Sequence, residues 1–192
     1  HRIMTWAGAK PATGLQAAAR DVRYRLMADW ARSAAGRVAI VTGHNMTDQA
    51  ETVMMRLARG SGPDGLAAMQ PLSERAGVVI ARPLLGVGGE VLREYLRGIG
   101  QAWIEDPSND CMDFERVRVR KAAGARAALG LTDAALALAA SRMARAVTAL
   151  EVATDEFMES ILGAQQPYLP LGALVWPKPA STPEEVVVRA LG

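Results

Sequence analysis

The sequence has few of the features that mark secreted or membrane proteins. It contains a single cysteine, Cys111, so no disulfide can form within the chain and nothing suggests secretion. No apolar run reaches the roughly 18 to 20 residues that a membrane-spanning helix requires. An initiator Met is also lacking: the chain opens with HRIMTWAGAK. Such a start is typical of a sequence that begins within a domain. We therefore expect a cytoplasmic protein without a membrane partner, and a fragment of a longer chain.

A strong excess of one charge is also lacking. The 22 Lys and Arg residues oppose 20 Asp and Glu residues, which leaves a net charge of +2 and a pI of about 9.0. This balance favours anionic partners only weakly. Half of the 192 residues are apolar, enough for the core of one ordinary domain with or without a small appendage. The oligomeric state is not determined by the sequence, and a homodimer is left open.

The order of the predicted elements indicates an α/β fold. Apolar runs predict strands at residues 2–6, 37–42, 77–85 and 102–110. Apolar residues at three- and four-residue spacing predict helices at 15–35, 47–58 and 89–99. The run RVAIVT at 37–42 is typical of a strand that is buried on both faces of a parallel sheet. We expect a parallel sheet with helices on both faces.

The rest of the chain is expected to be helical. A basic helical segment covers residues 113–126, a long Ala-rich helix follows at about 131–162, and a helical stub ends the chain. We place a domain boundary after residue 126. Residues 1–126 then form the α/β domain, and residues 127–192 form a helical subdomain.

A group of polar side chains follows the strand at 37–42. At about 100° per residue, a helix that starts early enough places His44, Asp48 and Glu51 within about 60° of one another, pointing outward together. They would lie at the carboxyl end of a strand, where open α/β sheets bind ligands. The same stretch also fits a simple helix start, with Asn45 or Thr47 as the N-cap and Asp48 favourable to the helix dipole. As a site, the group suits Mg²⁺ binding, an ammonium ligand or general base catalysis, and the pattern does not choose.

The segment RGSGPDG at 59–65 resembles a phosphate-binding loop. However, it follows a helix and lacks the Lys-Ser/Thr of a P-loop. We expect a helix C-cap and turn instead, in which Gly60, Gly62 and Gly65 adopt positive φ.

Two helical segments carry clustered arginines. In FERVRVRKAAGAR, at 114–126, Arg116 and Arg120 share one face, four residues apart. That face is either solvated or in contact with phosphate groups of RNA or a nucleotide. The segment AARDVRYR adds Arg20 and Arg23 on a second basic face.

Three stretches together resemble the tRNA(Ile)-lysidine synthetases. The family pattern HHxxDQxET…RxxRGSGxxGL is similar to GHNMTDQAETVMMRLARGSGPDGLAAM, and the preceding family helix is similar to AARDVRYRL. The pattern RPLL…WxxDxSNxxxxxxRNxxR is similar to RPLLGV…LREYLRGIGQAWIEDPSNDCMDFERVRVR. The resemblance covers roughly residues 1–121, and the long helix after it fits the helical linker of the family.

This resemblance implies both a fold and a reaction. The family has an N-type ATP pyrophosphatase domain, an adenine nucleotide alpha-hydrolase-like fold with parallel strands. It uses ATP and Mg²⁺ to adenylate C2 of the wobble cytidine in a tRNA(Ile) with a CAU anticodon. The ε-amine of free L-lysine then displaces AMP and forms lysidine.

The resemblance also implies roles for individual residues. Asp48 and Glu51 would bind lysine, and one of them would assist with its proton, while His44 would lie near the adenylated base or the phosphates. Arg116 would contact phosphate or the activated cytidine, and Arg20 or Arg23 would contact phosphate. No residue is assigned to a metal. The supporting positions are Gln49, Thr52, Arg82, Asp106, Asn109 and Arg120.

The sequence departs from the family pattern in several places. Asn45 replaces the second His, and Val117 replaces the Asn that follows the Arg of RNxxR. The SGGxDS loop that binds the ATP phosphates is absent and is expected upstream of residue 1, and the C-terminal tRNA-binding domain is also missing. We therefore expect this piece alone to be inactive.

Two other functions are considered. A different ATP pyrophosphatase, such as a tRNA thiolase, would commonly carry Cys pairs, and a single Cys111 argues against it. A non-catalytic RNA-binding module on the same scaffold is compatible with the missing loop and the basic helix.

Overall fold

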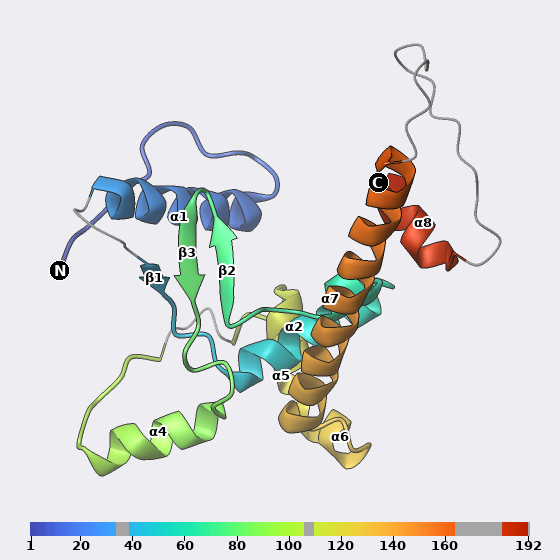
Figure 1. The fold of residues 1–192 in the computed structure, drawn as a ribbon. Helices are drawn as coiled ribbons and strands as arrows, with labels where there is room; N and C mark the ends of the chain where they lie inside the picture. The colour runs from blue at the N-terminus through green and yellow to red at the C-terminus, as the bar shows by residue number, and fades with distance from the viewer. Residues whose placement is uncertain (34–38, 106–109, 164–181, 192) are drawn as a thin grey trace.

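The computed structural model describes residues 1–33, 39–105, 110–163 and 182–191, and its elements follow one another in a mixed α/β order (Figure 1). In chain order these elements are α1 (Leu15–Ser33), β1 (Ala39–Val41), α2 (Met46–Ala58), α3 (Pro63–Leu66), β2 (Leu72–Arg75), β3 (Val78–Ala81), α4 (Gly89–Gly98), α5 (Glu115–Lys121), α6 (Ala123–Ala128), α7 (Asp133–Gly163) and α8 (Glu184–Leu191). The α/β class is confirmed, as are the main predicted helices. The supporting positions Asp106 and Asn109 lie outside the described residues.

Three strands form one sheet in the order β1–β3–β2. β1 and β3 are parallel, with Ile40 opposite Ile80, as the sequence predicted. β2 runs antiparallel to β3 and was not predicted, because its sequence, LSER, lacks an apolar pattern. The two strands are joined by a tight turn in which Ala76 and Gly77 have φ of 53° and 70°. Such turns usually carry Asn-Gly or Asp-Gly. Because Ala76 stands at the first of these positions, the sequence lacks the usual signal of a hairpin.

Helix α1 covers one face of this sheet (Figure 1). Ala28 and Ala31 pack against Val78, with Ile40 at the edge of the same apolar cluster. The predicted burial of RVAIVT on both faces is wrong, because the side chain of Val41 is 67% exposed. Alternation in β3 agrees with this, since its neighbouring residues point to opposite faces and only one face is packed.

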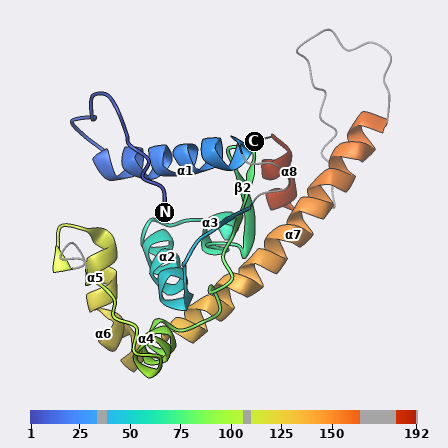
Figure 2. The ribbon, with the colours of Figure 1, turned by 90° about the vertical axis from the view of Figure 1, so that its left-hand side faces the viewer.

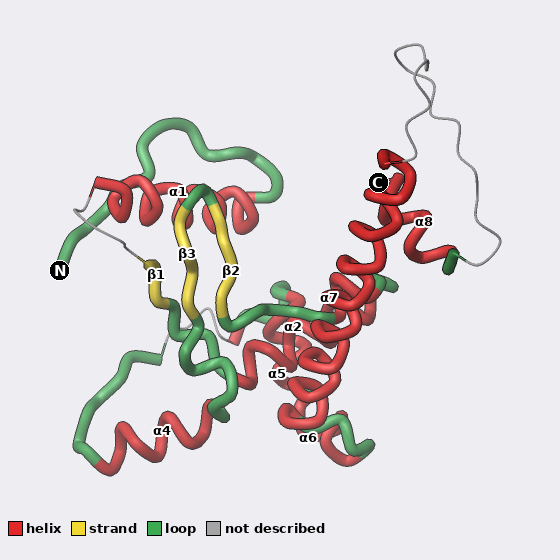
Figure 3. The backbone as a smooth tube through the Cα atoms, viewed as in Figure 1, coloured by secondary structure: helices red, strands yellow, loops and turns green. Residues whose placement is uncertain are grey.

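Within the residues that the structure describes, two segments predicted as strands have no strand structure. Residues 2–6 are loop, and so are residues 102–105 of the predicted strand at 102–110 (Figure 3). Neither segment pairs with β1, β2 or β3, and an extended segment is not a stable strand without a partner for its backbone groups. Apolar composition alone suggested these strands, but Ile104 is 95% exposed.

A second apolar cluster joins α2 to the long helix α7. The apolar side of α2 was expected to pack on the sheet, but Ala50 and Val53 pack instead against Leu136 and Ala140 of α7. Figure 2 shows α7 passing beside α2 and α3, with α8 against its far half. The boundary predicted after residue 126 falls inside α6. None of the helices in the described ranges is both long and apolar enough to cross a membrane.

The turn after α2 is a helix end, as predicted. The backbone N–H groups of Gly60 and Ser61 donate to the last carbonyls of α2, at 3.0 Å each. Gly60 has φ of 68°, but the predictions of positive φ for Gly62 and Gly65 are wrong. Gly65 is needed for space instead, because a Cβ there would lie 2.5 Å from Cβ of Ser61.

Candidate active site

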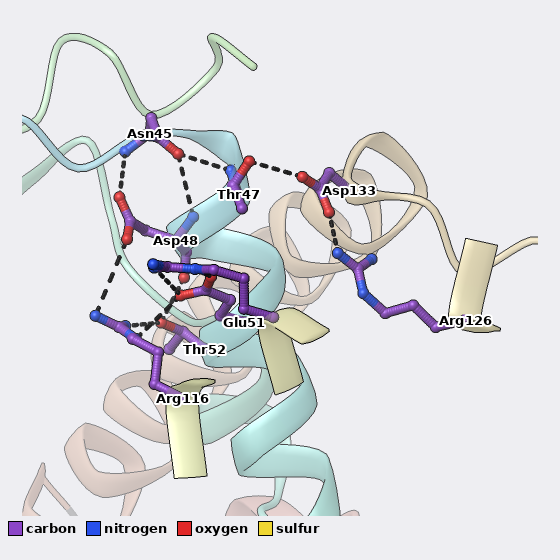
Figure 4. A network of polar contacts seen from close by, with 9 residues as sticks. Asn45, Thr47, Asp48, Glu51, Thr52, Arg116, Arg126 and Asp133 are labelled. Atoms are coloured by element: carbon purple, nitrogen blue, oxygen red, sulfur yellow. Dashed lines mark hydrogen bonds and ion pairs between the residues drawn. The ribbon is translucent and has the colours of Figure 1, made fainter. Parts of the chain in front are cut away.

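The first turn of α2 follows directly from the end of β1 and is capped by its own side chains. Asn45 is the N-cap, and its Oδ1 accepts hydrogen bonds from the N–H groups of Thr47 (2.9 Å) and Asp48 (3.2 Å). In return, Oδ2 of Asp48 accepts from the N–H of Asn45 at 3.0 Å (Figure 4). One carboxylate oxygen of Asp48 therefore has a structural task, and the side chains of Asn45 and Asp48 together satisfy three backbone N–H groups at the helix start.

Glu51 is the most buried charged side chain of the candidate site, with no exposed surface. Arg120 donates to it twice, from Nε to Oε1 at 2.6 Å and from Nη2 to Oε2 at 3.3 Å. Nε of Arg116 lies 3.2 Å from Oε2 as an ion pair without hydrogen-bond alignment. The prediction that Glu51 points outward is therefore wrong, because α5 packs over this face of α2.

Arg116 joins the polar residues of this face. Its Nη2 donates to Oγ1 of Thr52 at 3.2 Å, and its Nη1 lies 4.0 Å from Oδ1 of Asp48 (Figure 4). Two carboxylates thus meet two guanidinium groups, so the cluster is close to electrically neutral. Arg116 and Arg120 share a face, as predicted, and ion pairing decides against a purely solvated role for them.

His44 lies at the start of the same turn and is partly buried. Its Nδ1 is 2.8 Å from Oγ1 of Thr42. Burial lowers the pKa of His44 below its usual 6.5, and Arg82, Arg20 and Arg116 lower it further, against an opposite effect of Asp48. The imidazole is therefore neutral at pH 7 and able to accept a proton.

A basic cavity of about 490 Å³ lies between α1, α2 and α5. Its arginines are Arg20, Arg23, Arg59, Arg116 and Arg120. The structure thus brings both predicted basic faces together around one space. Arg59 was missed in the sequence, although it begins the RGSG segment, and it pairs here with Glu115. Such a lining attracts phosphate or another anion.

Two of the supporting residues fasten the loop at 67–71 and do not face the cavity. The side-chain amide of Gln49 makes two hydrogen bonds with the backbone of Met69, of 2.8 and 3.0 Å. Arg82 is 8% exposed, and its Nη1 donates to the carbonyl of Gln70 at 2.7 Å. Thr52 is close to the site, where its hydroxyl donates to the carbonyl of Asp48 at 2.8 Å.

Comparison with known proteins shows the family of this chain. The PP-loop domain family matches residues 1–126. A protein named tRNA(Ile)-lysidine synthase from Bradyrhizobium diazoefficiens is 49% identical over 155 residues, which are 81% of this chain and 43% of the relative. A protein of the same name from Rhodopseudomonas palustris is 47% identical over 171 residues, 87% of this chain and 49% of the relative. One from Methylobacterium nodulans is 40% identical over 193 aligned residues, 100% of this chain and 56% of the relative.

The chain spans about half the length of the curated relatives that it matches. The matched region includes α1, α2 and α5, which carry the cavity and the carboxylate–guanidinium cluster. The chain therefore belongs to the PP-loop domain family, and the resemblance to the tRNA(Ile)-lysidine synthetases that its motifs indicated is confirmed.

Proposed function

We propose that this chain serves the synthesis of lysidine on a tRNA(Ile) with a CAU anticodon, in the cytoplasm. ATP would adenylate C2 of the wobble cytidine, and free L-lysine would displace AMP through its ε-amine. The observation that carries this proposal is the pairing of the α2 carboxylates with arginines that also line a five-arginine cavity between α1, α2 and α5. Both a cationic amine and anionic phosphates would find partners there.

Phosphate groups would bind in the basic cavity. Arg20 and Arg23 reach it from α1, and Arg116 reaches it from α5. Arg116 also lies beside the carboxylates, so it is suited to stabilise negative charge as the cytidine is adenylated. The residues present therefore fit a phosphate-bearing substrate.

The lysine amine would bind beside Asp48. This side chain is 20% exposed, and its Oδ1 lies at the long distance of 4.0 Å from Nη1 of Arg116. Glu51 lies beneath and adds negative charge while it holds Arg116 and Arg120. The neutral His44, at the start of the same turn, would lie near the adenylated base or the phosphates. One of the two carboxylates, Asp48 or Glu51, would assist with the proton of the amine.

The described residues fit Mg²⁺ only as part of a complex with ATP. Among them, no three His, Cys, Asp or Glu side chains are grouped as a metal site. Both oxygens of Glu51 already face guanidinium groups. Mg²⁺ would then be held mostly by phosphate oxygens, with Asp48 as the available carboxylate, which is common for this ion.

We propose that residues 1–126 form part of the catalytic domain and that residues 127–192 belong to the helical linker. The 192 residues contain no SGGxDS motif, so we expect them not to form lysidine unaided. Measurable lysidine formation by these residues alone would contradict that expectation. An RNA-binding module without catalysis is the competing proposal, supported by the same basic cavity.

Two substitutions in the full-length protein test the proposal. Asp48→Asn and Glu51→Gln should raise the KM for lysine more than the KM for ATP, measured by lysidine formation on tRNA(Ile). Glu90→Gln is the control, because this carboxylate lies on α4 and pairs with the exposed side chains of Arg93 and Arg97. Equal effects on both substrates would contradict the assigned roles, and tRNA binding without any lysidine would favour the binding module.

A further inference from the structure

A chain of polar contacts joins the first turn of α2 to the start of α7 (Figure 4). Oγ1 of Thr47 donates to Oδ2 of Asp133 at 2.8 Å, across 86 positions of sequence. The other oxygen of Asp133 pairs with Nη2 of Arg126. Arg126 also donates from Nη1 to the carbonyl of Leu131 at 2.7 Å and is only 6% exposed. The Asp133 carboxylate is thus fixed from one side and holds Thr47 from the other.

Thr47 belongs to the turn that carries the proposed lysine contact. Its N–H donates to the same Asn45 oxygen that accepts from the N–H of Asp48. The N–H of Met46 donates to the carbonyl of Val87 at 2.9 Å, which ties the turn to the segment after β3. A displacement of Thr47 would therefore move the cap and, with it, the Asp48 carboxylate.

Packing alone would not fix this turn. Ala50 and Val53 already hold α2 against Leu136 and Ala140 of α7, but apolar contacts are not directional. A hydrogen bond to a carboxylate is directional, and it is stronger than one between neutral groups. The contact between Thr47 and Asp133 therefore adds orientation where the apolar cluster supplies attraction.

We propose that Asp133 is a positioning residue for the lysine step, acting through Thr47 on the turn that carries Asp48. The inference rests on the proposed function, because it concerns how well that turn receives lysine. It also gives the start of α7 a direct influence on the site, although α7 contributes no group that touches a substrate in this proposal.

The test uses the full-length protein with Thr47→Val, which keeps the shape of the side chain and removes its donor. We expect kcat/KM for lysine to fall about tenfold, the effect of losing one hydrogen bond to a charged group. The KM for ATP should stay within about twofold, because the phosphate-binding arginines are untouched. Thr47→Ser restores the hydroxyl and should recover most of the loss. Asp133→Asn keeps an acceptor for Thr47 but loses the ion pair with Arg126. We therefore expect a smaller loss of kcat/KM for lysine than in Thr47→Val.

Thr154→Val is the matched control, because its hydroxyl donates to the carbonyl of Leu150 within α7, away from α2. A fall in the melting temperature with equal losses for lysine and ATP would reduce the contact to a packing role and overturn the inference, as would unchanged kinetics for Thr47→Val. If the unmodified protein makes no lysidine, the proposed function itself fails. Amide hydrogen exchange at Thr47 and Asp48 then decides, since faster exchange in Thr47→Val supports the positioning and unchanged exchange refutes it.

Discussion

Replacing Glu51 with Gln would leave two guanidinium groups facing an uncharged amide inside the protein. Glu51 has no exposed surface, whereas the side chains of Arg116 and Arg120 are 34% and 38% exposed. Breaking a fully buried ion pair costs about 3 to 5 kcal/mol, and an exposed pair contributes less than about 1 kcal/mol. Because one side of this cluster is buried and the other is partly solvated, we expect Glu51→Gln to lower the free energy of unfolding by about 2 to 3 kcal/mol.

Urea unfolding of the chain, followed by far-UV circular dichroism, measures this change. Arg120→Gln and the double variant complete a thermodynamic cycle. The double variant should be less destabilised than the sum of the single ones, with a coupling of about 1 to 2 kcal/mol. Glu90→Gln on α4 should leave the urea midpoint unchanged, because its partners are exposed. A loss below about 0.5 kcal/mol for Glu51→Gln, within the range of ordinary surface changes, would refute the buried cluster.

Other positions give further expectations. The pKa of His44 is lowered in the folded protein, so the unfolded chain binds more protons than the folded one as the pH falls below 6.5. The free energy of unfolding therefore decreases as the pH falls. His44→Gln should flatten this part of a plot of melting temperature against pH. Asn45→Ala should cost about 1 kcal/mol in thermal unfolding through loss of the N-cap, and Asn45→Ser should recover most of it. Gln49→Ala should speed hydrogen exchange at the Met69 amide, which loses its acceptor. Arg23→Ala should weaken tRNA binding and lower its salt dependence by up to about 0.9 in the log–log slope for one lost phosphate contact.

Helix periodicity predicted the scaffold of the site well. The apolar spacing of α2 predicted which of its sides is buried, and Ala50 and Val53 do lie in the core, although their partner is α7 and not the sheet that was expected. Strand predictions were weaker, because a strand depends on partners that lie elsewhere in the chain. Residues 2–6 have the composition of a strand but no pairing in the sheet, while β2 pairs with β3 despite the polar sequence LSER.

The polar face of α2 shows where such reasoning stops. Spacing at 100° per residue gives the direction of Glu51 from the helix axis, but it does not give what packs over that direction. The covering helix, α5, lies far along the chain, since Arg116 follows Glu51 by 65 residues. Arg120 donates to the very carboxylate that was expected to meet solvent, and Arg116 lies beside it as an ion pair. An argument from charge could have helped to decide whether Glu51 faces solvent or a second helix. Carboxylates one helical turn apart on α2 are matched by arginines one turn apart on α5, and a carboxylate is rarely buried without such partners. Complementary spacing on two helices is therefore the sequence signal that this site offers.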